Sequence, residues 1–424
     1  MKKDQLFNLM LVHSAEEVDQ INKSFYGRYN YPWPPMMFPL YPAGTAEKFL
    51  NQDLGYWNHD RIFPNPKIWV AGCGTNQALF TALRFPESEV LGTDISTKSL
   101  EVCQNNARQL GITNLTLEEK SLNSIDYKSQ FDYVICTGVI HHNAEPDVCL
   151  KNLSSALKKD GVLELMVYNY YHRLLTTACQ KAVRSFYDIE SNFDMELELS
   201  LIQDLITDFQ QANLMGDFLK SFRHANKPHM ADSLLQPVEF SYNIESLNKM
   251  ADECNLELLI HCPNQFDASR GLLNWNMKFA SAGLQARYDQ LPDVKRWVIS
   301  NYLMFNDSPM LWFYLQRKDA TFKRKTENEI CDEFLATRFE RSTFETRNFL
   351  LNSNGNYILS DKRTTLPVSK YPSNPVANKI HANLDPAQNM HHTFSQLGID
   401  LSFQSVNDAK LNLTNSAFPY LKAK

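Results

Sequence analysis

Two closely spaced glycines, followed by an aspartate twenty residues further on, are the residues of this sequence whose spacing suggests chemistry. In the stretch KIWVAGCGTNQALFTALRFPESEVLGTDIS, residues 67–96, Gly72 and Gly74 follow one apolar run and Asp94 ends a second. Glycines at a strand-to-helix turn let the backbone approach a ligand, and the helix N-terminus offers free amides to a negative group. A carboxylate at the end of the next strand can bind both hydroxyls of a ribose. The pattern therefore predicts a nucleoside-containing cofactor.

Position 77 distinguishes between two classes of such cofactors. A dinucleotide site would normally have a third glycine there, so that the helix approaches a pyrophosphate closely, whereas this chain has Gln77. A NAD-dependent oxidoreductase is therefore a remote alternative. Two further alternatives stay open: a turn that only connects two elements, and a non-catalytic protein that keeps the fold for binding.

The segments around this turn alternate between apolar runs and helical patterns. We expect strands near residues 68–71, 90–93, 114–121, 131–138 and 161–168, with helices between them. Ser96 can cap the helix after the second strand, and Gly111 can end it. A helix capped by Asn243, a sixth strand that ends near Cys262 and a seventh at 309–318 complete the pattern. Such alternation predicts right-handed crossovers and a mostly parallel α/β sheet.

Three motifs resemble those of a known family. VAGCGTNQALFTAL, VLGTDIS and FDYVICTGVIHHN are similar to the first, second and fourth motifs of class I S-adenosylmethionine-dependent methyltransferases. The resemblance is close over about residues 60–170 and looser as far as Lys318. It implies a Rossmann-like seven-stranded sheet whose last strand is antiparallel and lies between strands five and six. The whole chain also resembles a bacterial group of such enzymes with an N-terminal YPWPP strap and a C-terminal extension.

The resemblance implies that the cofactor is S-adenosyl-L-methionine and assigns residues to its parts. Gly72 and Gly74 should pass under the methionine moiety, Asp94 should bind the ribose, and Ile95 should pack on the adenine. Other cofactor-binding residues are expected after strand three, near the adenine amine, and at the end of strand four, near the methyl group: Leu122, Asn123, Thr137 and Gly138. The third glycine of the family motif falls on Asn76.

Methyl transfer from a sulfonium is an in-line displacement, so the protein chiefly aligns the reacting groups. A base is needed only if the acceptor arrives protonated. The catalytic candidates are His141 and His142, just beyond strand four, and Tyr170, in the tyrosine-rich segment after strand five. The alternative is that the tandem histidines fix a loop and that the tyrosines form a wall of the pocket. The expected acceptor is a small molecule or a peptide or protein side chain.

Composition limits the classes of partner. The net charge is −6, and the Asn/Asp-Pro-Pro-Tyr signature of nucleic-acid amine methyltransferases is absent after strand four, where the chain reads CTGV. No nucleic-acid partner is therefore expected. None of the 8 cysteines falls in a C-x-x-C pair, so no metal site is expected. No apolar run reaches membrane-spanning length, so we expect no membrane partner and a cytoplasmic location.

The chain is long enough for more than one unit. We expect an N-terminal helix and an aromatic, proline-rich strap in residues 1–60, and a methyltransferase domain in residues 61–318. Helical cap insertions are expected at 169–240 and 263–308, and a small α+β accessory module at 326–424, through which the protein could form a homo-oligomer. Residues 24–42 should be extended, with Tyr26, Tyr29 and Tyr31 closing over the cofactor end of the sheet; packing on the far side of the domain is the alternative.

The Asp94→Ala variant should bind S-adenosylhomocysteine at least about tenfold more weakly, because two charge-assisted hydrogen bonds are lost. Calorimetry measures this directly. An unchanged affinity would remove Asp94 from the site, and a preference for NAD would exclude the methyltransferase interpretation.

Overall fold

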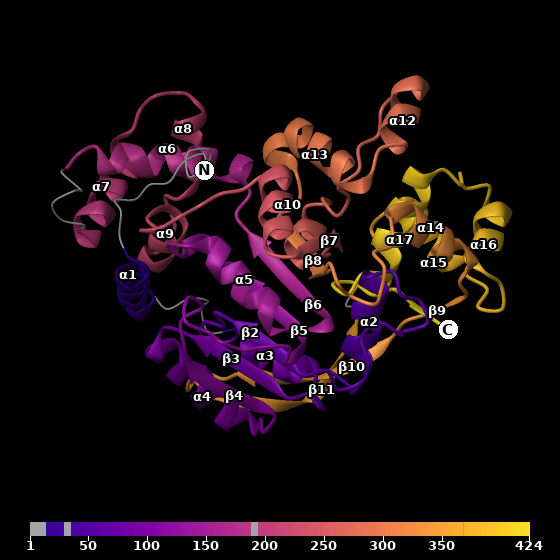
Figure 1. Cartoon of the computed structure of the whole chain (residues 1–424), viewed down its shortest axis with the longest axis horizontal. Coiled ribbons are helices and arrows are strands. Elements are labelled where there is room, and N and C mark those ends of the chain that lie inside the picture. The colour runs from indigo at the N-terminus through magenta and orange to yellow at the C-terminus, as the bar shows by residue number, and fades with distance from the viewer. Residues whose placement is uncertain (1–13, 29–34, 188–193, 368) are drawn as a thin grey trace.

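The computed structural model describes residues 14–28, 35–187, 194–367 and 369–424. Its centre is a seven-stranded sheet in the order β4-β3-β2-β5-β6-β8-β7 (Figure 1). The strands are β2 (Ile68–Ala71), β3 (Val90–Asp94), β4 (Leu115–Glu119), β5 (Phe131–Thr137), β6 (Leu157–Val167), β7 (Leu256–His261) and β8 (Leu311–Arg317). Only the two pairings of β8 are antiparallel. The predicted sheet is confirmed. Its last strand, β8, is antiparallel and lies between β6 and β7, the fifth and sixth strands of the sheet in chain order.

Alternate residues of each central strand face two layers of helices. In β2, Ile68 and Val70 pack on one face, while Trp69 and Ala71 pack on the other. Because all four residues of β2 are buried, the strand reads as a continuous apolar run. The flanking helices are α3 (Gln77–Arg84) and α4 (Thr97–Leu110) on one face, and α5 (Pro146–Ala156), α10 (Ile244–Glu253) and α13 (Asp293–Met304) on the other.

The helix caps predicted at Ser96, Gly111 and Asn243 are confirmed. The Ser96 side chain accepts a hydrogen bond from the Ser99 N–H, and Gly111 ends α4 with φ at 66°. Asn243 forms a capping box with Ser246 at the start of α10. The Ser96 cap fixes the start of α4, and it lies two residues after Asp94, which ends β3. Asp94 therefore lies at the same edge of the sheet as the glycine turn.

The described residues between 170 and 234 form four helices, which gather with α1 at one side of the molecule (Figure 1). They are α6 (Tyr170–Arg184), α7 (Met195–Asp208), α8 (Leu214–Ser221) and α9 (Lys227–Leu234), and α1 is Ala15–Arg28. Phe25 of α1 lies in their shared core. Glu198, from the acidic stretch of α7, is fully buried and binds Arg184 at 2.8 Å, so this charge holds the helices together. We call α6–α9 the cap.

The second insertion contains α11 (Gln265–Ser269), α12 (Ala282–Asp289), α13 and the 3-10 turn η2 (Phe305–Asp307); another 3-10 turn, η1, is Ile140–His142. No helix in the described ranges has the length and apolar character needed to cross a membrane.

The N-terminal segment differs from the expected extended strap. Helix α1 continues to Arg28, so residues 24–28 are helical. The prediction extended the influence of the prolines too far, because the first of them is Pro32. Strand β1 (Met37–Leu40) is extended as expected and accommodates Pro39 because it lies at the edge of its sheet. Tyr29 and Tyr31 lie outside the described residues.

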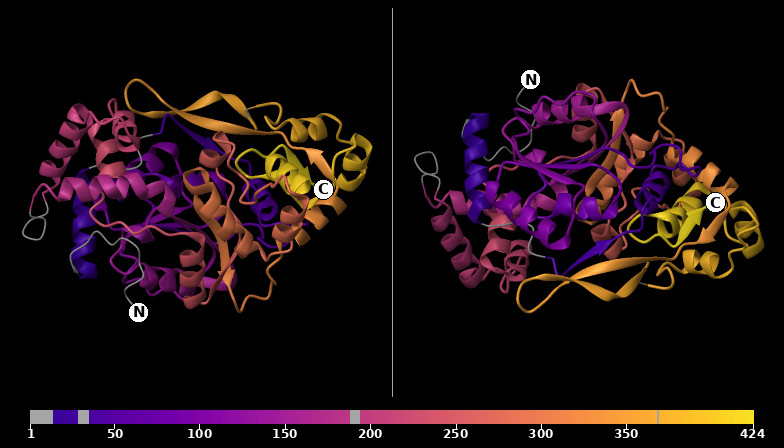
Figure 2. Two further views of the ribbon diagram at one scale, coloured as in Figure 1. Left: turned by 90° about the horizontal axis from the view of Figure 1, so that it is seen from above. Right: turned by 90° about the horizontal axis from the view of Figure 1, so that it is seen from below.

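The chain after residue 326 takes no part in the seven-stranded sheet. It contains α14 (Glu327–Ala336), β9 (Phe339–Arg341), β10 (Phe344–Leu351), β11 (Tyr357–Leu366), α15 (Pro375–Ala382), α16 (Met390–Leu397), α17 (Phe403–Thr414) and β12 (Leu421–Ala423). Strand β10 pairs with both β11 and β1, and this three-stranded sheet runs along one side of the molecule (Figure 2). The expected helix, hairpin and short helices are all present.

This C-terminal segment shares its core with the rest of the chain. Phe334 of α14 is fully buried, and its ring centroid lies 5.6 Å from that of Trp57. Gln52, in helix α2 (Thr45–Asp53), accepts a hydrogen bond from the Ala423 N–H at 2.7 Å and donates to the Leu421 carbonyl at 3.1 Å. Residues on both sides of the boundary expected near residue 326 therefore pack in one continuous core.

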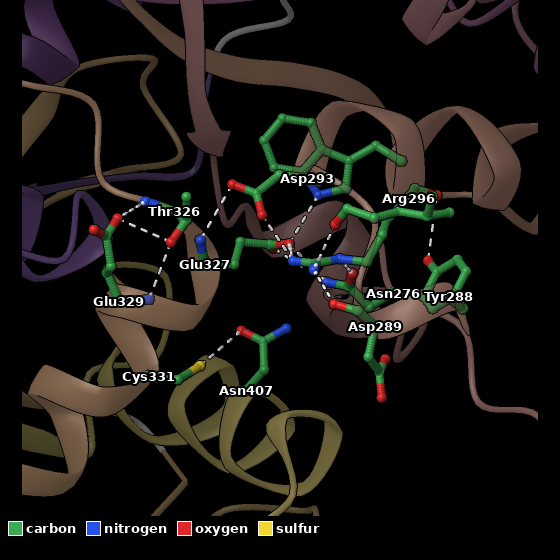
Figure 3. A network of polar contacts seen from close by, with 12 residues as sticks. Asn276, Tyr288, Asp289, Asp293, Arg296, Thr326, Glu327, Glu329, Cys331 and Asn407 are labelled. Carbon is green, nitrogen blue, oxygen red and sulfur yellow. Dashed lines mark hydrogen bonds and ion pairs between the residues drawn. The ribbon is translucent and has the colours of Figure 1, made fainter. Parts of the chain in front are cut away.

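A buried network of charges joins the C-terminal segment to α13 (Figure 3). The Arg296 guanidinium, 1% exposed, binds Asp293 at 2.8 Å and Glu327 at 3.0 Å. Arg324 reaches Asp293 from the connecting segment, and the Trp297 indole donates to Glu327 at 3.2 Å. Removing one partner would leave an uncompensated buried charge, at a cost of about 3–5 kcal/mol.

The Phe334→Ala variant should destabilise the whole chain by about 3–5 kcal/mol, because it opens a cavity in a core that both parts share. Thermal unfolding should remain a single transition at a lower temperature, and binding of S-adenosylhomocysteine should be lost at that transition. Ile358→Ala is the matched control, since Ile358 belongs to the same segment but is 57% exposed. Two separate transitions, with binding retained through the first, would show an independent module.

Candidate active site

A cavity of about 500 Å³ lies at the carboxyl ends of β2, β3, β5 and β6. This is a usual size and place for a ligand site in an α/β sheet. Seven of the residues expected at a cofactor line it: Gly72, Gly74, Asp94, Ile95, Leu122, Thr137 and Gly138. Asn123 lies behind this wall, where its amide donates to Asp19 at 3.1 Å and its oxygen accepts from the Cys149 thiol at 3.3 Å.

The glycine turn between β2 and α3 has a left-handed backbone. Gly72 has φ of 68° and Gly74 φ of 53°. A Cβ atom on Gly72 would lie 2.5 Å from a Val139 methyl group, so the turn and the segment after β5 can approach only because residue 72 has no side chain. Gly72 therefore determines the width of the cavity between these two elements.

The Asp94 carboxylate links the two turns that border the cavity. It accepts hydrogen bonds from the N–H groups of Gly74 and Ser96, each at 2.8 Å. Burial raises the pKa of Asp94, and these backbone hydrogen bonds oppose the shift. The remaining lone pairs face a cavity of nucleoside-compatible size, so the chain's own residues fit a ribose at this position.

Gln77 occupies the first position of α3 and lines the cavity. Its amide donates to the Thr137 hydroxyl at 2.5 Å, which ties the helix to the end of β5. The residue that replaces the dinucleotide-type glycine thus fills the space in which a pyrophosphate would approach the helix.

Helix α1 borders the cavity through Asn22 and Tyr26, which lie one turn apart. The Asn22 amide donates to the His142 carbonyl at 2.7 Å, and the Tyr26 hydroxyl accepts from the Gln236 amide at 2.9 Å. Beyond the undescribed residues 29–34, β1 instead lies against α3, where the ring centroids of Phe38 and Phe80 are 4.7 Å apart.

The two adjacent histidines have different surroundings. His142 lines the cavity, and its Nδ1 lies 2.8 Å from the Val238 carbonyl, so Nδ1 carries the proton and Nε2 keeps a lone pair. Burial lowers the pKa of His142 to about 4, so the ring is neutral at pH 7. His141 is fully buried outside the cavity lining, and neither of its ring nitrogens has a hydrogen-bond partner among the described residues. Burial also lowers the pKa of His141.

Tyr168, rather than Tyr170, lines the cavity. The His141 ring packs against the Tyr168 ring with centroids 3.9 Å apart, and the Arg173 guanidinium lies 4.4 Å from the Tyr168 centroid. Arg173 is held in turn by both oxygens of buried Glu239, at 2.7 and 2.6 Å. Tyr168 is thus a fixed wall, while Tyr170 packs against Tyr171 outside the lining.

Several lining residues were not expected from the sequence. Tyr168 is not one of them, because it belongs to the tyrosine-rich segment expected as a wall of the pocket. Met166, two residues before Tyr168, and the pair Met310 and Trp312 around the start of β8 had a readable signal, because residues two apart lie on one face of a strand. Asp232 in the cap and Phe266 in α11 had none, because each lies in an insertion. The described residues contain no group of three or more His, Cys, Asp or Glu that could hold a metal ion.

Residues 70–185 match a family model described as a methyltransferase domain. The chain carries a methyltransferase domain. The fold of nearly the whole chain is similar to that of PKMT2 from Rickettsia typhi, with a TM-score of 0.56 and 14% identity over 92% of this chain and 76% of that one. The same protein has been solved in complex with AdoHcy, at a TM-score of 0.55.

Curated relatives match shorter segments. Uncharacterized protein syc1184_c from Synechococcus sp. is 26% identical over 200 residues, which is 46% of this chain and 48% of the relative. A tRNA U34 carboxymethyltransferase from Campylobacter lari is 34% identical over 96 residues, 22% of this chain and 32% of that enzyme. The chain therefore spans half or less of the curated relatives it matches.

The Gly72→Ala variant should bind S-adenosylhomocysteine at least about tenfold more weakly, because the new methyl group collides with Val139 and opens the methyltransferase turn. Gly111→Ala is the matched control: its φ is also positive, 66°, but nothing lies within 4 Å of the added atom. It should lose about 1–2 kcal/mol of stability and keep its affinity. Equal affinities of the two variants in calorimetry would contradict a role for the close approach of Gly72.

Proposed function

We propose that the protein transfers the methyl group of S-adenosylmethionine to a small molecule or to a peptide or protein side chain. The observation that carries this proposal is that one cavity contains both the cofactor turn and a second wall of polar and aromatic side chains. Gly72, Gly74 and Asp94 belong to the first part, and His142 and Tyr168 belong to the second.

The cofactor supplies a methyl group that its sulfonium already activates, so the chain has to bind and align. Asp94 would bind the ribose hydroxyls and Ile95 would pack on the adenine. Thr137 and Gly138 would border the reacting end of the cofactor, opposite the acceptor. Leu122 would contact the adenine, while Asn123 would act indirectly, by fixing the wall through Asp19.

His142 is suited to contact the acceptor. Its Nδ1–H is fixed by the Val238 carbonyl, so Nε2 is a neutral acceptor that can orient or take up a proton from an O–H or N–H group. Tyr168 provides a rigid surface beside it, because Arg173 and His141 both pack against its ring. A role for His141 or Tyr170 in contact with substrate has no such support, since neither lines the cavity.

A non-catalytic binding protein is the main alternative, and an acceptor on nucleic acid remains opposed by the net charge of −6. Incubating the protein with methyl-labelled S-adenosylmethionine and cell lysate, followed by mass spectrometry of labelled products, separates transfer from binding. Binding of S-adenosylhomocysteine without any transfer would favour the non-catalytic alternative.

The His142→Asn variant should lower the turnover number by about 10²-fold without weakening cofactor binding, because the group that orients the acceptor is lost. The asparagine amide nitrogen takes the place of Nδ1 and can still donate to the Val238 carbonyl. His141→Asn is the control, and it should reduce stability while changing turnover less, since His141 lies outside the cavity lining. Turnover that falls equally in both variants would show that the pair acts through packing alone.

A further inference from the structure

Asp232 is a partly buried carboxylate that lines the cavity and has few partners. It lies in α9 of the cap, and among the described residues its carboxylate accepts one side-chain hydrogen bond, from the Gln236 amide at 3.4 Å. Burial raises the pKa of Asp232 to about 6, and the positive charge of Arg173 opposes the shift. An acid in such surroundings gains most from a cation that enters the cavity.

The neighbouring charges are already engaged. Glu239 forms a two-point ion pair with Arg173, and Asp94 accepts two backbone hydrogen bonds at the other end of the cavity. Lys120, the one lysine among the described residues of the lining, is paired with Glu118 at 2.8 Å. Asp232 is therefore the carboxylate of the described lining that a ligand can pair with most fully.

A buried amide links Asp232 to a tyrosine of α1. The fully buried Gln236 amide contacts both the Asp232 carboxylate and the Tyr26 hydroxyl, so the cap and α1 meet at this point. Burial raises the pKa of Tyr26, and the charges of Asp232 and Tyr168 add to the shift. Because one amide nitrogen bonds both groups, the Tyr26 hydroxyl and the Asp232 carboxylate are close enough to face the same ammonium group, which carries three N–H donors.

Part of the cavity lining is apolar. Met166, Phe266, Met310 and Trp312 line the same cavity, and Phe266 is 58% exposed. These side chains would pack on an aliphatic stem, and the partly exposed Phe266 marks the side from which a chain can enter.

We propose that Asp232 binds the ammonium group of an alkyl amine, and that the nitrogen of this amine is the methyl acceptor. The inference rests on the proposed methyltransferase function. The amine belongs either to a small molecule or to a side chain of a peptide, because both present the same charged nitrogen on an aliphatic stem.

The reaction balances without any further reagent. The bound ammonium first releases one proton to water, and its nitrogen lone pair then forms a bond with the methyl carbon. The electrons of the breaking carbon–sulfur bond stay on sulfur, so the sulfonium becomes a neutral thioether. The product leaves as a methylated ammonium ion, and His142 Nε2 can orient the neutral amine through an N–H hydrogen bond before the attack.

The test compares label transfer by the wild type and Asp232→Asn. Full-length protein is incubated with methyl-labelled S-adenosylmethionine and two lysates, one untreated and one with its amines acetylated beforehand, each split into protein and ultrafiltrate. We expect base-stable label in the untreated lysate only, and the fraction that carries it identifies the source of the amine. Asp232→Asn should lower transfer at least about thirtyfold, while calorimetry with S-adenosylhomocysteine shows unchanged affinity. Asp217→Asn is the matched control, because Asp217 lies on a neighbouring cap helix with its side chain 77% exposed.

The other outcomes are distinct. Equal transfer to the acetylated lysate, or base-labile label, would overturn the amine inference and leave the methyltransferase proposal intact. Weaker binding of S-adenosylhomocysteine by Asp232→Asn would assign the carboxylate to the ammonium group of the cofactor and would also overturn the inference. Failure of the wild type to transfer label to any fraction would overturn the proposed function, and the amine inference with it.

Discussion

The hydrogen bonds of one carboxylate hold the site together. Asp94 accepts from the backbone of the β2–α3 turn and from the backbone of the β3–α4 turn, so these two turns keep a fixed distance. The left-handed Gly72 can then approach the segment after β5, and the space that remains has the size of a nucleoside ligand. A loss of this carboxylate would therefore change both a ligand contact and the shape of the cavity, which is why the Gly72 and Gly111 pair provides the cleaner comparison.

The other elements support this arrangement from outside the sheet. The cap contributes Asp232 to the cavity lining, α1 contributes Asn22 and Tyr26, and the second insertion contributes Phe266. Glu239, which follows the cap in the chain, binds Arg173 of α6. The C-terminal segment contributes no residue to the described lining, but its core is continuous with that of the sheet through Phe334 and the Arg296 network. Its main physical contribution to the site is rigidity, because α13 and α14 fix the insertion that borders the cavity.

The sheet and the cofactor turn could be predicted from the sequence because their signals are local. The apolar runs, the Ser96 cap and the spacing from Gly74 to Asp94 each depend on residues close in the chain. The prediction that residues 24–28 are extended is wrong. Prolines restrict the backbone only at their own positions and just before them, and the first proline here is Pro32. Asp232 and Gln236 could not be predicted, because their meeting with Tyr26 depends on how the cap packs against α1, and no periodicity encodes that. The positions of His141 and His142 relative to the cavity likewise depend on the 3-10 turn η1 that contains both.

The pairing of β1 with β10 constrains the order in which the protein can be made. Met37–Leu40 emerges from the ribosome early, but its partner Phe344–Leu351 is synthesised only after the whole sheet and the cap. Until then Phe38 and the outer surface of α3 lack the strand that covers them in the finished molecule. The nascent chain thus carries an unpaired edge strand and an uncovered apolar face through most of translation, which is the condition under which chaperones bind and premature release leads to aggregation.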